Sequence, residues 1–482
     1  ETFKCVEPPP AGTNIAGTRW VFTRKSNGDY KARLVVQGFS QRYGEDYFET
    51  YAGVSRLETM RMCCAISAIE GWTMVIFDVN NAYLTTPIKE KVYIWAPAGT
   101  GLPQGTVCLL LKSIYGTHQA GRDYQEFFAA NMAELKAMPT PSDPCLYIKA
   151  AEPGRPKTLT HSHVDDCITH CKSRAEAERF VAEIHKRLPL RSGDTEYLSA
   201  QIVRGPNMEV CISQSRMLMD IVNTELGTQH FNPTQTPMTK STGRTLSKRR
   251  PDQPKLRNPK DLMRIVGKLI YPMIYTRPDL GQAVSRLARY SADPSDEHMA
   301  AAKQVLRYLK GTVDRGLVYK RGGLKDIRKG LVAFSDSDWA ADPDDRKSTT
   351  GMAIFLGLCL VMWKSLKQPL VGLNTAESEY IALAYVVKHV LCERQQLKEI
   401  GFPQSGPTTI FVDNISAIHI AEGATKSSKF IDIRWHFIRD AIQAGHVQVV
   451  HISTEYNISD LFTKPLESPR FQTLREQLLG TQ

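Results

Sequence analysis

Residues 159–171, LTHSHVDDCITHC, place two adjacent aspartates, Asp165 and Asp166, between two strand-like runs. Apolar and β-branched residues flank the pair, so the pattern predicts a hairpin that carries both carboxylates near its turn. Two carboxylates packed together in a partly buried turn repel each other unless a cation offsets the repulsion. This stretch therefore favours a fold in which a sheet presents paired acids to a bound cation.

Two other interpretations of this stretch remain open. Zinc is the first, because five nearby side chains are potential ligands. They are His161, His163, Cys167, His170 and Cys171. Structural zinc sites usually draw ligands from separated knuckles, whereas these residues lie along expected strands, whose side chains alternate between faces. An acidic turn without chemistry is the second, but magnesium, which prefers hard carboxylate oxygens, fits better than either.

Asp78 ends another apolar run, residues 72–79 (WTMVIFDV), which predicts a buried strand. One acid at a strand end and an adjacent pair on a hairpin are what a two-metal phosphoryl-transfer site requires. Two cations about 4 Å apart can stabilise the attacking and leaving oxygens together. Nucleotidyl transfer needs little more from a protein than positioning and charge. We therefore expect Asp78 to meet Asp165 and Asp166 at one metal site.

Four further acids stand at separated places in the last third of the chain. They are Asp336 and Asp413 at strand ends, Glu379 in the first turn of a helix expected over 374–400, and Asp460 at a helix start. Leu383, one helical turn after Glu379, is apolar, which directs Glu379 towards the sheet; Glu377 is the alternative. Such positions converge in an α/β fold, so the set predicts a second two-metal site.

The composition is that of a large, basic, folded chain. Its 482 residues predict two to four domains, and 42% apolar residues supply their cores. A formal charge of +11 is typical of proteins that meet phosphates, although charge alone establishes no partner. No run reaches 18 apolar residues and no signal-peptide pattern opens the chain, so we expect no membrane contact. Ten scattered cysteines fit reduced thiols, and the start at Glu1 indicates a fragment or a processed product.

Strands and helices alternate in two blocks on either side of a basic segment. Residues 18–39 predict a hairpin around the turn signal at 27–29. Residues 231–260 are rich in Pro, Thr, Lys and Arg. The stretch from Lys240 to Arg264 contains nine basic residues and only two acids. This segment predicts a solvated linker or the edge of a thumb.

The second block begins with a helix expected over 294–310, for which Asp293 is a suitable N-cap. Beyond residue 326, three strand-like runs surround the long helix over 374–400. They are residues 330–336, 351–363 and 408–414. The alternation predicts an α/β domain.

Several of these motifs, in this order, carry a family resemblance. The runs KARLVVQGFSQRYGEDYFETYAGVSRLETMR, FDVNNAYL, LLKSIYGTHQAGRDY and HVDD resemble the reverse transcriptase of copia-type LTR retrotransposon Pol polyproteins. The later runs LIYPMIYTRPDL, VLRYLKGT and FSDSDWAADPDDRKSTTG resemble the same polyprotein. The likeness covers about residues 15–468, and the four C-terminal acids match the D-E-D-D set of its ribonuclease H domain.

The resemblance implies an α/β (α+β) chain of three parts. Reverse transcriptase fingers and palm would span 1–205, a thumb and connection with the basic Pro-rich linker 206–325, and a ribonuclease H-like domain with a mixed sheet 326–482. The implied function is RNA-directed DNA polymerase, with hydrolysis of the RNA strand of the hybrid. Implied partners are an RNA template, a DNA primer, dNTPs and RNA–DNA hybrid, together with self-association or an integrase from the same polyprotein. The implied location is a cytoplasmic virus-like particle or the nucleus.

The resemblance also implies metal ligands. Asp78, Asp165 and Asp166 would hold two Mg²⁺ ions, with the backbone carbonyl of Val79 as a further ligand and Mn²⁺ as an alternative ion. A second pair of Mg²⁺ ions would be held by the four acids of the last third of the chain, Asp336, Glu379, Asp413 and Asp460.

Nucleotide contacts are implied at four positions. Tyr83 would lie under the incoming sugar, where its ring would exclude a 2′-hydroxyl. Lys31 and Arg33, on the hairpin of the fingers, would contact the triphosphate. Gln119 would lie on the template or nucleotide side of the pocket.

Two positions depart from the family pattern. His163 replaces the tyrosine of Tyr-Val-Asp-Asp, and Gly121 replaces the proline of Gln-Ala-Pro-Arg. The imidazole is smaller and more polar than the phenol ring expected under the primer end. An alternative function is therefore a catalytically decayed, element-derived protein that binds nucleic acid with strong salt dependence but without turnover.

Overall fold

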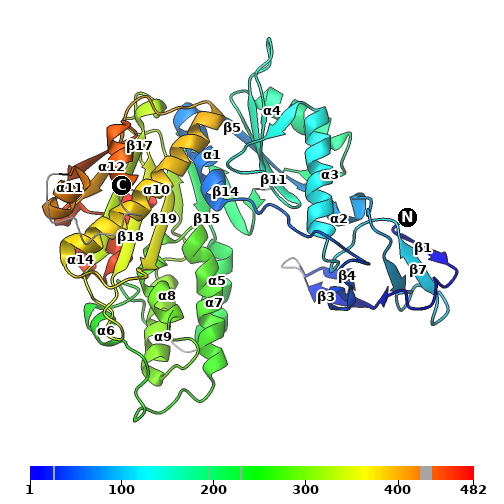
Figure 1. Cartoon of the computed structure of the whole chain (residues 1–482), viewed down its shortest axis with the longest axis horizontal. Coiled ribbons are helices and arrows are strands. Elements are labelled where there is room, and N and C mark those ends of the chain that lie inside the picture. The colour runs from blue at the N-terminus through cyan, green and yellow to red at the C-terminus, as the bar shows by residue number, and fades with distance from the viewer. Residues whose placement is uncertain (25–27, 194, 228–230, 424–436, 482) are drawn as a thin grey trace. The chain divides into compact units, whose positions relative to one another are not determined.

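The computed structural model (Figure 1) describes residues 1–24, 28–193, 195–227, 231–423 and 437–481. Its contacts define two compact units. The first comprises Glu1–Arg56 and Thr73–Asp194, and the second comprises Leu57–Trp72 and Thr195–Gln482. No helix within the described ranges is both long and apolar enough to cross a membrane.

A six-stranded sheet is the centre of the first unit, in the order β12-β5-β11-β10-β9-β8. Its strands are β5 (Thr73–Val79), β8 (Ala137–Pro139), β9 (Leu146–Lys149), β10 (Thr158–His163), β11 (Asp166–Cys171) and β12 (Leu190–Ser192). Helices α3 (Ala120–Glu134) and α4 (Arg174–His185) cover one face, where Phe128 and Phe180 share a core with Phe77. The strand expected at 72–79 and the acidic hairpin are both confirmed.

The hairpin expected over residues 18–39 is also present, as β3 (Thr18–Arg24) and β4 (Tyr30–Val36). Gly28 in its turn has φ +91°, a conformation that favours glycine; Asn27 lies outside the described residues. A smaller sheet has the order β1-β7-β6-β2. Its strands are β1 (Phe3–Val6), β2 (Ile15–Ala16), β6 (Tyr93–Trp95) and β7 (Val107–Leu110), and the short helix α2 (Ala82–Thr85) follows β5 in the chain.

A mixed five-stranded sheet, in the order β19-β18-β17-β20-β21, dominates the second unit. Its strands are β17 (Leu331–Asp338), β18 (Thr349–Leu356), β19 (Cys359–Lys367), β20 (Thr408–Val412) and β21 (Val447–His451). β17, β18 and β19 are antiparallel, whereas β20 runs parallel to β17 and β21 parallel to β20. The expectation of one strand over 351–363 is wrong, because Gly357, with φ +62°, turns the chain between β18 and β19.

The long helix α10 (Thr375–Ile400) crosses one face of this sheet (Figure 1). The Asn374 side chain caps it by accepting the Glu377 N–H at 2.9 Å, and Gly401 ends it in a left-handed conformation. The helix expected over 374–400 is thus confirmed, although Glu379 lies in its second turn rather than its first.

The remaining elements of this unit are one antiparallel sheet and a set of helices. The sheet has the order β13-β14-β15-β16, from β13 (Glu196–Tyr197), β14 (Ala200–Arg204), β15 (Val210–Ser213) and β16 (Leu317–Tyr319). The helices are α1 (Leu57–Glu70), α5 (Ser215–Leu226), α6 (Lys240–Thr245), α7 (Pro259–Tyr275), α8 (Gly281–Ala288), α9 (Asp296–Lys310), α11 (Ile415–Ala421), α12 (Phe437–Gln443), α13 (Asp460–Thr463) and α14 (Ser468–Leu479).

The N-cap expected for the helix over 294–310 is wrong. α9 begins at Asp296 and Ser295 is its N-cap, with the Ser295 N–H donating to His298 Nδ1 at 3.0 Å. Asp293 instead forms ion pairs with Arg249 at 3.0 Å and Lys255 at 3.3 Å. Asp293 therefore does not cap the helix, because its carboxylate binds basic residues that are distant in the sequence.

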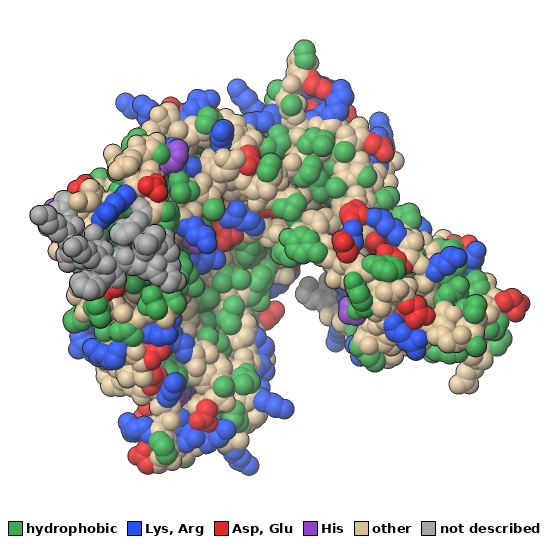
Figure 2. Space-filling view, viewed as in Figure 1, with side chains coloured by type: hydrophobic (Ala, Val, Ile, Leu, Met, Phe, Trp, Pro, Cys, Tyr) green, Lys and Arg blue, Asp and Glu red, His purple; other side chains and the backbone are tan. Residues whose placement is uncertain are grey.

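The basic segment 231–260 is docked rather than solvated along its length. Met238 and Leu246 within it are buried, and Leu246 accepts hydrogen bonds through its carbonyl from Arg286 and Tyr290. Lys and Arg side chains, interspersed with Asp and Glu, are spread over the end of this unit that holds α7 and α9 (Figure 2). The segment is therefore part of the folded unit.

A fully buried ion pair ties the helices of the second unit together. Arg277 donates to Asp279 through Nε at 2.9 Å and through Nη2 at 2.7 Å. The Tyr308 hydroxyl of α9 donates to the same carboxylate at 2.6 Å, and Arg475 of α14 donates to that hydroxyl at 3.3 Å. A buried charge is tolerated only when it is paired and hydrogen-bonded, so the four side chains depend on one another.

We expect Asp279→Ala to lower the free energy of unfolding of the second unit by about 3–5 kcal/mol, because it leaves Arg277 charged and unpaired in the core. Urea denaturation followed by circular dichroism measures the loss. The control is Asp252→Ala, which removes an exposed ion pair with Arg250 at 3.6 Å, and we expect it to cost less than about 1 kcal/mol. Equal losses for the two variants would contradict this account.

Candidate active sites

The first set of acids meets at the ends of β5 and β11. Asp166 is the direct cross-strand partner of Asp78, and the Val79 N–H donates to the Asp165 carbonyl at 2.8 Å. All three carboxylates are half-buried. Like charges placed opposite each other destabilise a sheet. Arg191 on β12, the other cross-strand neighbour of Asp78, lies 3.9 Å from its carboxylate and offsets part of this repulsion, and a bound cation would offset more.

A strained turn presents the pair. His163, the last residue of β10, is the cross-strand partner of Asp166, the first residue of β11. Only Val164 and Asp165 therefore form the turn between the two strands. Val164 has φ +56°, which is an outlier for a β-branched residue and costs about 1–3 kcal/mol. Such strain clusters at functional sites because the surrounding structure must hold it in place.

Three side chains connect the β3–β4 hairpin to these acids. The guanidinium of Arg33 lies 5.6 Å from the ring centre of Tyr115, which packs edge-to-face on Tyr83 at 4.9 Å. Burial, the Tyr115 ring and the charge of Asp165 raise the pKa of Tyr83, so its hydroxyl stays protonated at neutral pH. The predicted positions Arg33 and Tyr83 thus lie in one array with Asp165. Tyr115 is a member that the sequence argument missed, although it stands in the motif LLKSIYGTHQ.

The other two predicted nucleotide contacts lie differently. Lys31 is exposed on β4, two residues before Arg33 and so on the same face of the hairpin. Gln119 is only 1% exposed, and both ends of its amide are engaged. It donates to the Asp46 carbonyl at 3.0 Å and accepts from the Gln41 side chain at 3.2 Å. Gln119 fixes a loop in this structure rather than offering a free polar group.

The potential zinc ligands do not gather. His161 and His163 lie on β10, and Cys167, His170 and Cys171 on β11, where successive side chains alternate faces. His161 lies 3.6 Å from Asp143, and His163 Nδ1 lies 2.6 Å from the Ser55 hydroxyl. Of the His, Cys, Asp and Glu side chains that the structure describes, no three from this stretch bring ligand atoms within 4.8 Å of one another.

The second set of acids converges more tightly. Asp336 lies on β17, Asp413 directly follows β20, and Asp460 begins α13. Ligand oxygens of these three carboxylates lie within 4.8 Å of one another, and Asp336 is only 1% exposed. Burial and the neighbouring Asp460 raise the pKa of Asp336 well above its ordinary value. We call these three residues and Glu379 the acid cluster.

Glu379 completes the acid cluster from α10. It is 3% exposed, and its Oε2 has no hydrogen-bond partner among the described residues. Burial and the charges of Asp336 and Asp413 raise its pKa well above the ordinary value. Glu377, the alternative, instead accepts the Leu373 N–H at 2.7 Å at the start of the helix. The structure favours Glu379.

Basic side chains that the sequence argument missed hold the acid cluster in place. Lys464 lies 2.7 Å from Asp460 and 3.8 Å from Asp336, and Arg470 of α14 also pairs with Asp460. The Thr463 hydroxyl donates to Asp336. Burial alone would lower the pKa of Lys464, but Asp336 and Asp460 raise it overall. The spacing of Asp460 and Lys464 by four residues was the available sequence signal.

The acid cluster fits a divalent cation. Oxygens of its three aspartates lie within 4.8 Å of one another, and Glu379 Oε2 is buried without a hydrogen-bond partner among the described residues. This is the donor chemistry that Mg²⁺ and Mn²⁺ prefer. The first set offers the same carboxylate donors, and strand pairing brings their backbones together. The oxygens of its three carboxylates, however, do not all lie within 4.8 Å of one another. Both sets keep their metal-binding roles as predictions.

Comparison with known proteins assigns the class. Residues 1–240 match the family described as reverse transcriptase (RNA-dependent DNA polymerase). These residues include the first set of acids, the β3–β4 hairpin and the rings of Tyr83 and Tyr115. This part of the chain belongs to the reverse transcriptase family.

Individual relatives narrow the assignment. The chain is 34% identical, over 99% of its length, to the retrovirus-related Pol polyprotein from transposon RE2 of Arabidopsis thaliana. It is 30% identical, over 98% of its length, to the polyprotein from transposon TNT 1-94 of Nicotiana tabacum. It spans 33% and 36% of those two relatives. The resemblance to copia-type Pol polyproteins is confirmed, and the chain corresponds to about a third of such a protein.

A solved structure supports the fold. The foamy viral protease–reverse transcriptase in complex with double-stranded DNA matches with a TM-score of 0.51, over 92% of this chain and 67% of that chain. The sequence identity is 10%, so the likeness concerns the fold alone. It confirms the α/β polymerase fold.

We expect the stability of the metal-free protein to fall as the pH rises above about 4, the ordinary pKa of a carboxyl group. The folded pKa values of Asp336 and Glu379 are raised, so the folded state binds more protons than the unfolded state above that pH. Thermal denaturation in chelator measures this loss as the difference in Tm between pH 5 and pH 8. Asp336→Asn should make that difference smaller. Each kcal/mol of pH-dependent stability that the variant removes should change it by about 2–4 °C.

The matched control for this experiment is Asp314→Asn, which changes an exposed acid in the same unit. It should leave the difference in Tm between the two pH values at the parent value. If Asp336→Asn also leaves that difference unchanged, the acids of the acid cluster are not the source of the pH dependence.

Proposed function

We propose that this chain copies RNA into DNA at the first set of acids and hydrolyses the RNA of the resulting hybrid at the acid cluster. The observation that carries the proposal is the register of β11 on β5, which pairs Asp166 with Asp78 beside Asp165. Membership of the reverse transcriptase family and the match to transposon Pol polyproteins support it. The solved relative bound to double-stranded DNA supports a nucleic-acid partner.

In the polymerase site, the protein positions the reacting groups. Bound Mg²⁺ would be held by Asp78, Asp165 and Asp166, with the Val79 carbonyl as a further ligand, and would supply charge that stabilises the phosphoryl oxygens. Arg33, with Lys31 on the same face, is placed to bind the triphosphate. Tyr83 packs on Tyr115 and is fixed there, so its ring can form the floor under the sugar and exclude a 2′-hydroxyl.

In the nuclease site, the acid cluster would hold the metal, and Lys464 and Arg470 position Asp460. The reaction is hydrolysis of a phosphodiester in the strand that carries 2′-hydroxyls, which such enzymes recognise by shape and sugar contacts. The partners we propose are an RNA template, a DNA primer, dNTPs and the hybrid, in a cytoplasmic virus-like particle or the nucleus. Self-association or an integrase from the same polyprotein would complete the assembly.

The second candidate, a protein that binds nucleic acid without turnover, is favoured by one observation. His163, where the family has tyrosine, is half-buried and engaged by the Ser55 hydroxyl at 2.6 Å. Burial and the neighbouring His161 lower its pKa, so the ring is neutral at physiological pH. Its stacking surface under a primer end is smaller than that of tyrosine.

Primer extension on an RNA template with Mg²⁺ tests the polymerase. We expect Asp166→Asn to reduce extension by about 100-fold or more, since losing a metal ligand removes several kcal/mol of charge stabilisation. Glu134→Gln, an exposed acid paired with Arg187, is the control and should extend like the parent. Absence of extension by both the parent and His163→Tyr would remove the polymerase function.

Cleavage of a labelled RNA–DNA hybrid tests the nuclease. Asp413→Asn should cut the RNA strand about 100-fold or more slowly than the parent, for the same electrostatic reason. Asp440→Asn on α12, an exposed acid, should cut at the parent rate. If Asp413→Asn cuts as fast as the parent, the assignment of the acid cluster is wrong.

A further inference from the structure

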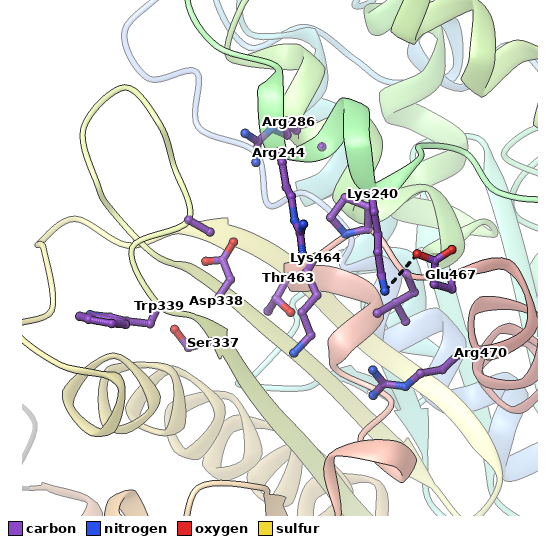
Figure 3. A pocket seen from close by; sticks show the side chains of 14 residues that line it. Lys240, Arg244, Arg286, Ser337, Asp338, Trp339, Thr463, Lys464, Glu467 and Arg470 are labelled. Atoms are coloured by element: carbon purple, nitrogen blue, oxygen red, sulfur yellow. Dashed lines mark ion pairs between the residues drawn. The ribbon is translucent and has the colours of Figure 1, made fainter.

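A cavity of about 610 Å³ lies in the second unit, where α6, α8, the end of β17 and the α13–α14 segment meet. Five cationic side chains line it. They are Lys240, Arg244, Arg286, Lys464 and Arg470 (Figure 3). Only two acids, Asp338 and Glu467, line the same cavity. Its lining therefore carries an excess of positive charge, and its volume suits a small ligand group.

Two of these cations form no direct ion pair with a described residue. Lys240 is paired with Glu467 at 3.1 Å, and Arg470 is paired with Asp460. Among the described residues, neither Arg244 nor Arg286 forms an ion pair. Figure 3 shows that Arg244 extends from α6 into the cavity, beside Arg286.

The burial of Arg286 makes its lack of an ion-pair partner significant. Its side chain is 4% exposed, and Nη2 donates to the Leu246 carbonyl at 3.0 Å. Its Nε is buried and has no hydrogen-bond partner among the described residues. Burial raises the pKa of Asp338 and the nearby charge of Arg286 opposes that rise, but the two side chains form no ion pair. A buried guanidinium without a direct ion-pair partner is costly, so a bound anion would stabilise it.

The cavity directly adjoins the acid cluster. Thr463, Lys464 and Arg470 line the cavity and also contact Asp336 or Asp460. An anion in the cavity would therefore lie beside the nuclease site, because side chains that position the acids of that site also line the cavity. An anionic polymer presented to the acid cluster would pass close to the cavity.

The close packing of α6 shows that the cavity is a built feature. A Cβ placed on Gly243 would lie 2.0 Å from Cγ of Pro465, so only glycine allows α6 to approach the α13–α14 segment this closely. α6 in turn brings Arg244 from the basic segment 231–260, to which the proposed reactions assign no role. The approach of α6 thus completes the positive lining of the cavity.

We propose that this cavity binds a backbone phosphate of the nucleic acid presented to the acid cluster, with Arg244 and Arg286 as its principal contacts. The inference rests on the proposed function. A guanidinium binds a phosphate through two parallel N–H donors, which gives both affinity and a fixed register. The basic segment then acts as a positioning element for the hybrid, and the cavity sets the distance from this phosphate to the site of cleavage.

The test measures binding of a fluorescently labelled RNA–DNA hybrid in chelator, where no cleavage occurs, over a series of NaCl concentrations. We expect Arg244→Gln to raise Kd about tenfold, the effect of one charged contact. The slope of log K against log salt should fall by about 0.9, the value for one phosphate contact. The control is Lys398→Gln, which removes one exposed charge from the last turn of α10.

Hybrids with a single neutral methylphosphonate linkage, moved along each strand, locate the phosphate. One or two positions should weaken binding by the parent, and the same positions should have no further effect on Arg244→Gln. Arg286→Gln should give the same pattern if its Tm stays within a few degrees of the parent. Gly243→Ala, which displaces α6 without removing charge, should also raise Kd.

The outcomes separate the two proposals. If the parent binds and cleaves hybrid while Arg244→Gln matches Lys398→Gln in Kd and in slope, the cavity proposal is overturned and the nuclease function stands. If the parent does not bind hybrid at all, both fall. If inorganic phosphate at matched ionic strength stabilises the parent but not Arg244→Gln, and no methylphosphonate position matters, the cavity binds small phosphates rather than a strand.

Discussion

The antiparallel pairing of β11 with β5 is the constraint on which the first unit of this chain depends. It sets Asp166 opposite Asp78 and lets the Val79 N–H bond to the Asp165 carbonyl. A slip of one residue would turn every side chain of β11 to the other face. Asp166 would then enter the core beneath the sheet, and Cys167 would leave it. The core around Phe77 and Phe180 therefore fixes the geometry of the acids, although it touches no substrate.

The two sets of acids solve the same electrostatic problem in different ways. The first set is half-buried, so water can screen the repulsion between its carboxylates. In the acid cluster, Asp336, Glu379 and Asp460 are buried, and the protein supplies Lys464 and Arg470 against Asp460. Those cations lower the cost of assembling the acids, and they also make the site dependent on α14, which carries Arg470.

Much of this arrangement could be predicted from the sequence, because it follows from local patterns. Asp78 and the Asp165–Asp166 pair sit at the ends of apolar runs, and Asn374 and Gly401 bound a helix with standard caps. What could not be predicted depends on partners that are distant in the chain. Asp293 is occupied by Arg249 and Lys255, so Ser295 caps α9. Gln119 is held by Gln41 and Asp46, which no motif indicates.

The helix α14 enters two separate buried networks through two of its residues. Arg475 bonds to Tyr308 above the Arg277–Asp279 pair, and Arg470 bonds to Asp460 in the acid cluster. A premature stop codon or frameshift shortly before Ser468 would remove both contacts at once, although every acid of both sets would still be translated. Among element copies that accumulate mutations, retention of the acidic motifs alone is therefore a poor guide to a competent enzyme, and the integrity of the last helix should be scored with them.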